Sequence, residues 1–208
     1  MKPPLPALTL HVPKLGRDVV LRPLENSPED RHRVRSAYRA LPESARMNRF
    51  WSNNASLSEK MIDHLLNADQ LNHVVWAALD PSDPELPGIG AASYWRDPNN
   101  PTTAEFSITV GARFQRHGIG TLLLALLWLI ARRHGIQSFF GHVRFDNRPA
   151  LRWFGKIGVD STVQSGDIHV NWQLRSPEEI DALTAPPAIL PQIADWQRQL
   201  DTLIEPKA

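Results

Sequence analysis

The chain has 208 residues, and its 23 Lys and Arg against 22 Asp and Glu leave a net charge of +1, so whole-protein charge gives no guide to function. Hydrophobic residues make up 42% and charged residues 22%, which excludes a disordered or fibrous chain and favours one folded domain. The absence of cysteine excludes a disulfide framework, a Cys-ligated metal and a thiol nucleophile.

No segment has the pattern of a membrane span or an export signal. The longest apolar run, residues 122–131, is half of the roughly 20 residues that cross a bilayer. Residues 1–13 contain four prolines and no apolar stretch. We therefore expect a cytoplasmic protein that has no contact with a membrane.

Proline marks the expected boundaries, because the 18 prolines concentrate in residues 1–13, 81–101 and 177–191, which we interpret as loops or tails. The sequence predicts an N-terminal extension (1–17), a main domain (18–175), and a Pro-rich linker with a C-terminal helix (176–208). The apolar side chains of that helix recur on one face, so we expect it to dock on the domain or on a second subunit. A homodimer is thus a candidate.

The first half of the main domain begins with a strand at 18–24. Ser27, with Pro28 after it and acids in the first turn, predicts a helix that runs to about Leu41. Ser56 and Glu59 form a capping-box pattern that predicts a second helix, to about Asn67.

The second half alternates strands with helices. Short Asp-Pro turns join the first three strands, which predicts an antiparallel meander. The whole chain is predicted to be α/β with a mixed sheet. The expected strands are 73–79, 88–95, 103–110, 138–144, 159–163 and 168–174, and the expected helices are 118–134 and 147–157.

The turn before the long helix has the composition of an anion site. Gly118 and Gly120 allow close approach to the backbone, and the start of the helix supplies unpaired N–H groups, so a phosphate or pyrophosphate fits there. Thr121 and Leu122 replace the Lys-Ser/Thr of a Walker A loop, and Leu123 replaces the third glycine of a dinucleotide fingerprint. Both of those sites are disfavoured.

Residues 113–156 hold eight basic side chains and one acid, which suits a polyanion such as coenzyme A. A solvated basic face and a nucleic-acid surface are the alternatives. Nucleic acid is disfavoured as a ligand because aromatic side chains are not interleaved with these basic residues.

Two motifs in this region resemble one family. Gln115-Arg-His-Gly-Ile-Gly120 is similar to the Gln/Arg-x-x-Gly-x-Gly/Ala motif of the GNAT (GCN5-related) N-acetyltransferases, and residues 147–159 resemble their second cofactor segment. The resemblance covers roughly residues 21–174. It implies the GNAT fold, a mixed, mostly antiparallel central sheet flanked by helices, and acetyl transfer from acetyl-CoA to a primary amine.

A finer resemblance lies in residues 41–51, which look like a segment of bacterial protein-lysine acetyltransferases of the Pat type. It favours protein lysine as the acceptor. A small-molecule amine remains an alternative, and so does a non-catalytic acyl-CoA-binding sensor.

The family resemblance also implies roles for individual residues. The backbone around Ile108, Thr109 and Val110 would pair with the pantetheine arm, and the amide of Val110 would stabilise an oxyanion. Asn147 would contact the cofactor, although its role as a helix N-cap is equally credible. The pyrophosphate would be held by Gln115, Arg116, His117, Gly118, Ile119, Gly120 and Thr121.

Glu105 is the candidate general base, because a lysine near pH 7.5 is neutral in only roughly a thousandth of molecules. Strand alternation places Glu105 on the polar face and Phe106 on the other. The family's usual acid, a tyrosine, is replaced by Phe154, with Ser107 and His142 as speculative substitutes. The eight histidines lack ligand spacing, so no metal is predicted.

Overall fold

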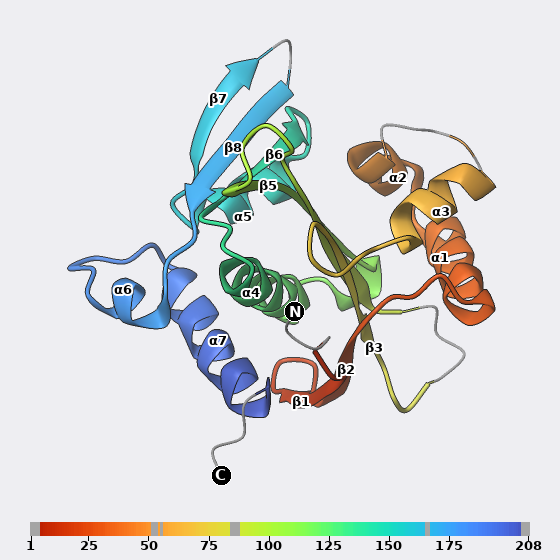
Figure 1. The fold of residues 1–208 in the computed structure, drawn as a ribbon, viewed down its shortest axis with the longest axis horizontal. Helices are drawn as coiled ribbons and strands as arrows, with labels where there is room; N and C mark the ends of the chain where they lie inside the picture. The colour runs from red at the N-terminus through yellow and green to blue at the C-terminus, as the bar shows by residue number, and fades with distance from the viewer. Residues whose placement is uncertain (1–4, 51–53, 55, 84–87, 165–166, 205–208) are drawn as a thin grey trace. The chain divides into compact units, whose positions relative to one another are not determined.

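The computed structural model describes residues 5–50, 54, 56–83, 88–164 and 167–204 (Figure 1). The chain forms two compact units, one made of residues 1–94 and 108–123 and the other of residues 95–107 and 124–208. Strands β4 (Gly90–Arg96) and β5 (Thr103–Val110) and helix α4 (Ile119–Arg133) each contribute residues to both units.

The first unit contains strands in the order β1-β2-β3-β4. Strands β1 (Leu8–Val12) and β2 (Arg17–Pro23) pair antiparallel, as do β2 and β3 (His73–Leu79). Strand β1 lies in the proline-rich segment that the sequence predicted to be a loop or tail, and that prediction is wrong for these residues. Leu8, Leu10 and Val12 alternate with polar residues and are buried, which is the pattern of a half-buried strand.

Helix α1 (Pro28–Ala40) begins as predicted, with the Ser27 hydroxyl accepting the amide of Asp30 at 3.2 Å. Asp30 is buried, and Arg22 donates to its two carboxylate oxygens at 2.8 and 2.5 Å. Burial raises the pKa of Asp30, but hydrogen bonds from Arg22 and from the Glu25 amide outweigh it, so the net pKa lies below 3.8. This ion pair fixes the start of α1 to β2.

The second predicted helix of the first unit begins later than expected. Helix α3 spans Glu59–Leu66, and its N-cap is Ser58, which accepts the amide of Met61, rather than Ser56. Ile62 and Leu66 pack in a buried cluster with Val75 of β3. Helix α2 (Glu43–Phe50) was not predicted at all, and it carries most of the segment at 41–51. Trp51 of that segment lies outside the described residues.

The second unit continues the strand order as β5-β6-β8-β7. Strand β5 pairs parallel with β6 (Ser138–Arg144), whereas β8 (Asp167–Gln173) pairs antiparallel with both β6 and β7 (Asp160–Gln164). The rings of Phe106, Phe139 and Trp172 pack on one another on the buried side of these strands. The predicted fold class, a mixed and mostly antiparallel sheet with flanking helices, is confirmed.

Helices complete the second unit. Helix α5 (Arg148–Gly155) follows β6, and α6 (Pro177–Asp181), which was not predicted, begins with a capping box of Ser176 and Glu179. Helix α7 (Leu190–Ile204) lies beside α4 (Figure 1), and an ion pair of 2.6 Å joins Arg133 to Asp201. None of the helices in the described part of the chain is long and apolar enough to cross a membrane.

Candidate active site

The turn between β5 and α4 is shaped by its own hydrogen bonds. After β5 the amide of Gly111 donates to the carbonyl of Ile89 at 3.0 Å, and a short 3-10 helix follows at Ala112–Phe114. The Gln115 side chain then donates back to the carbonyl of Val110 at 3.2 Å. The last predicted pantetheine-binding residue and the first predicted pyrophosphate-binding residue are thus tied together within the first unit.

Two residues of this turn have left-handed backbone conformations. Gly118 has φ of 89°, which glycine adopts without cost, as the motif predicts. Arg116 has φ of 66°, which costs a non-glycine residue roughly 1–2 kcal/mol, and nothing in the sequence predicted it. When left-handed residues alternate with right-handed or extended ones along a turn, successive amides point toward one place. This is how a backbone forms an anion-binding concavity.

The amides at the start of α4 are available to a ligand. The first helical hydrogen bond runs from Leu122 to the carbonyl of Gly118 at 2.9 Å. Within the described ranges, the N–H groups of residues 118–121 have no partner. A Cβ at Gly120 would meet only Val110 Cγ2, at 3.7 Å, so the fold itself does not require glycine there. We call the amides of residues 118–121 the anion cradle.

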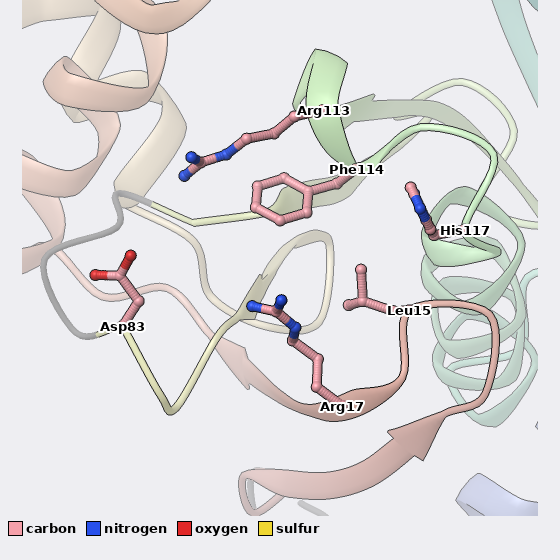
Figure 2. Close-up of a pocket in the computed structure, with 6 residues that line it drawn as sticks. All are labelled: Leu15, Arg17, Asp83, Arg113, Phe114 and His117. Carbon is pink, nitrogen blue, oxygen red and sulfur yellow. The ribbon is translucent and has the colours of Figure 1, made fainter.

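A cavity of about 330 Å³ lies on one flank of the turn (Figure 2). Arg113, Phe114 and His117 reach it from the turn, and Arg17 reaches it from the start of β2. The Arg113 guanidinium lies 4.8 Å from the Phe114 ring centroid, and Nδ1 of His117 is buried without a hydrogen bond. The cavity wall thus carries two arginines, Arg17 and Arg113, and one carboxylate, Asp83.

Arg17 is partly neutralised, because it donates to the buried carboxylate of Asp80 at 2.6 Å. Hydrogen bonds from Ser82 and then from Arg17 hold the pKa of Asp80 below its ordinary value. The sequence did not single out Arg17, since only the fold brings the β1–β2 turn to this cavity.

Glu105 lies in the second unit, where it is opposite Phe140 of β6. Its side chain is exposed, while those of Ala104 and Phe106 are buried, so the burial alternates as predicted at residues 104–106, whereas residues 107–110 are all half-buried. In the described parts of the chain no side chain pairs with its carboxylate. Glu105 is therefore a solvent-facing carboxylate that can accept a proton.

Asn147 acts as the N-cap of α5, because its Oδ1 accepts the amide of Ala150 at 3.3 Å. Just before it, Arg144 and Asp146 form an ion pair at 2.7 Å, and this hydrogen bond holds the pKa of Asp146 below its ordinary value. The helix then exposes Arg148 and Arg152, four residues apart on one face. The structure assigns Asn147 the capping role and leaves its contact with a cofactor as a prediction.

The candidates for a general acid have different environments. Phe154, at the family's usual tyrosine position, is buried and packs edge-on against Phe106 with ring centroids 5.7 Å apart. Ser107 is half-buried on the strand of Glu105. His142 is exposed, and its ring centroid lies 3.8 Å from that of His169. Sequence reasoning missed His169, because only the register of β6 against β8 brings it to His142.

The predicted residues thus fall into two groups, each described within its own unit. Residues 108–110 and 115–121 lie together in the first unit, whereas Glu105, His142 and Asn147 lie in the second.

Comparison with known proteins gives the family. The acetyltransferase (GNAT) family profile matches residues 38–159, which is more than half of the chain. The chain therefore belongs to the GNAT family of acetyltransferases.

Individual relatives agree with this assignment. Acetyltransferase Pat of Mycolicibacterium smegmatis is 27% identical over 140 residues, and the match spans 67% of this chain but only 41% of Pat. Acetyltransferase PA5475 of Pseudomonas aeruginosa is 28% identical over 155 residues, which is 72% of this chain and 82% of that protein.

Two solved structures share the fold. The GNAT domain of S. lividans PAT has a TM-score of 0.72 at 21% identity and covers 81% of this chain and 97% of its own. The acetyltransferase YncA of Salmonella typhimurium, solved with its cofactor acetyl-CoA, has a TM-score of 0.57 at 20% identity and covers 82% and 98%.

Proposed function

We propose that this chain transfers the acetyl group of acetyl-CoA to a primary amine, with protein lysine as the preferred acceptor and Glu105 as the general base. The observation that carries the proposal is the exposed carboxylate of Glu105 on β5, with which no side chain of the described residues pairs. Membership of the GNAT family supports acetyl transfer in general. The choice of protein lysine as acceptor and of Glu105 as base is part of this proposal.

The residues at the cradle fit the phosphates of acetyl-CoA. Four successive amides lack a partner in the described ranges, Gly120 leaves the space of a side chain free, and Arg113 adds positive charge. The adjacent backbone of residues 108–110 would pair with the pantetheine arm. That a structural relative was solved with acetyl-CoA supports this choice of donor.

Glu105 would supply the proton transfer that the amine needs. An ammonium group gives one proton to the Glu105 carboxylate, and its nitrogen then attacks the thioester carbonyl. The carbon–sulfur bond breaks, and the thiolate takes the second proton of the nitrogen. The residue at the family's usual tyrosine position is Phe154, which lies in the buried aromatic cluster and has no proton to donate. This scheme therefore uses no tyrosine as the acid.

Protein lysine is the favoured acceptor because of the segment at 41–51, most of which forms α2. Arg46 of this helix lies over the Tyr38 ring at 5.8 Å, and Arg49 donates to Ser93 of β4. These two cations suit an acceptor with acidic neighbours. A small-molecule amine is the second candidate, and a cytoplasmic location and a homodimer belong to the same proposal.

The test is a thiol-release assay with lysine peptides and with small amines, for the wild type and for Glu105→Gln. We expect turnover on peptides, and a fall in kcat of roughly 100-fold or more in the variant, because the base is lost. We expect acetyl-CoA affinity to stay within about threefold, because the substitution leaves the backbone amides that would bind the phosphates unchanged. Glu178→Gln, which changes an exposed glutamate on α6, is the matched control. Unchanged turnover in Glu105→Gln contradicts the assignment of the base.

A further inference from the structure

The register of the second unit places a row of side chains beside Glu105. Glu105 lies opposite Phe140 in β6, Phe140 opposite Asn171 in β8, and Asn171 opposite Asp160 in β7. Directly paired residues project from the same face of a sheet. Glu105, Asn171 and Asp160 are exposed and Phe140 between them is half-buried, so this row is open to solvent.

The next row along the same face contains the two histidines. His142 pairs with His169, and His169 pairs with Thr162. The imidazole rings meet edge-to-face with centroids 3.8 Å apart, and the Phe140 ring lies 6.5 Å from His142. With strands about 4.8 Å apart and a rise of about 3.3 Å per residue, the Cα atoms of Glu105 and His142 are separated by roughly 8 Å. A glutamate and a histidine side chain are long enough to meet across this separation, directly or through one water.

The reaction requires a route for a proton. An ammonium group and acetyl-CoA give an amide, a thiol and one free proton, so each turnover leaves a proton on the base. Glu105 must lose that proton before the next acceptor binds. Imidazole exchanges protons readily near neutral pH, because its ordinary pKa is about 6.5.

We infer that His142 and His169 form a proton relay that takes the proton from Glu105 and releases it to solvent. The inference rests on the proposed function and deepens it. The proton passes from the Glu105 carboxylate to the His142 imidazole on the neighbouring strand, and it leaves to solvent from His142 directly or through His169. Among the described residues, the other charged groups on this face are Asp160, Arg144 and Asp167, of which the last two are opposite one another in the following row.

A cross-strand pair of rings also stabilises a sheet, so the test must separate the two roles. His142→Asn removes both the ring and the proton exchange, whereas His142→Phe keeps ring packing and removes only proton exchange. We expect both variants to lower kcat about tenfold with little change in KM, since relay loss slows proton transfer. Added imidazole restores turnover in both variants and leaves the wild type unchanged.

The controls are Glu105→Gln, which imidazole does not rescue, and His32→Asn, which changes an exposed histidine of α1 in the other unit. If His142→Phe keeps wild-type turnover while Glu105→Gln loses it, the relay is wrong and the proposed function stands. If Glu105→Gln keeps its turnover, or the wild type has none with any amine, the proposed function falls and the relay with it.

Discussion

The cradle at residues 118–121 and the polar face around Glu105 differ in what they are made of. The cradle consists of backbone amides at the start of α4, set in place by the left-handed Arg116 and Gly118. The face consists of side chains on separate strands, brought together by the register of β5, β6 and β8. A backbone site is encoded within one short stretch of sequence, whereas a side-chain site depends on the whole sheet.

This difference predicts where substitutions act. A change at the cradle affects binding only when it blocks the amides or alters their direction. A change on the face affects turnover through one functional group at a time. The following variants test this contrast.

The largest effect is expected at Gly120. We expect Gly120→Val to keep the fold, because the first added atom, Cβ, would meet only Val110 Cγ2, at an ordinary 3.7 Å. Its methyl groups would shield the amides, so acetyl-CoA affinity should fall roughly 100-fold, as expected when charged phosphates lose several backbone donors. Calorimetric titration measures the affinity for acetyl-CoA. The control is Gly155→Ala on α5, where a Cβ meets nothing within 4 Å. Equal affinities of the two variants would contradict a cradle made of backbone.

A smaller effect is expected at Phe154, which tests whether a tyrosine at this position would act as the acid. Phe154→Tyr introduces a hydroxyl into the buried aromatic cluster with Phe106 and Trp172. We expect kcat to stay the same and the free energy of unfolding to fall by about 1–2 kcal/mol. Urea denaturation and the thiol-release assay measure the two quantities. A large rise in kcat would mean that the position does face the reacting atoms.

The smallest effect is expected at Arg116, where a change to glycine should raise stability through the backbone and lower acetyl-CoA affinity through the lost charge. Arg116→Gly removes the cost of φ at 66° and should raise the free energy of unfolding by up to about 1 kcal/mol. Acetyl-CoA affinity should fall no more than about fivefold, because an exposed charge contributes little compared with the amides. A loss as large as that of Gly120→Val would show that the guanidinium, rather than the backbone, holds the ligand.

The same contrast explains what the sequence predicted. The turn at 115–120, the helix after it and the cap at Asn147 were found because each depends on neighbouring residues. The capping serine of α3 was displaced from Ser56 to Ser58, because two serines satisfy the same pattern and only one lies at the boundary.

Other elements were missed because their signals are weak or not local. Proline at positions 3, 4, 6 and 13 obscured the alternation of β1, and α2 has eight residues and no buried face. The partner of His142 is 27 residues away in sequence, at a position that only the β6–β8 register reveals. The left-handed conformation of Arg116 follows from the turn around it and has no signal of its own.

The most direct test of the account is a calorimetric titration of acetyl-CoA into the wild-type chain and the Glu105→Gln variant. We predict saturable binding at one site in both proteins, with affinities within about threefold of each other, because the cradle and the base are separate groups. Absence of binding to the wild type would contradict the cradle. Loss of binding in Glu105→Gln alone would contradict the separation of binding from catalysis.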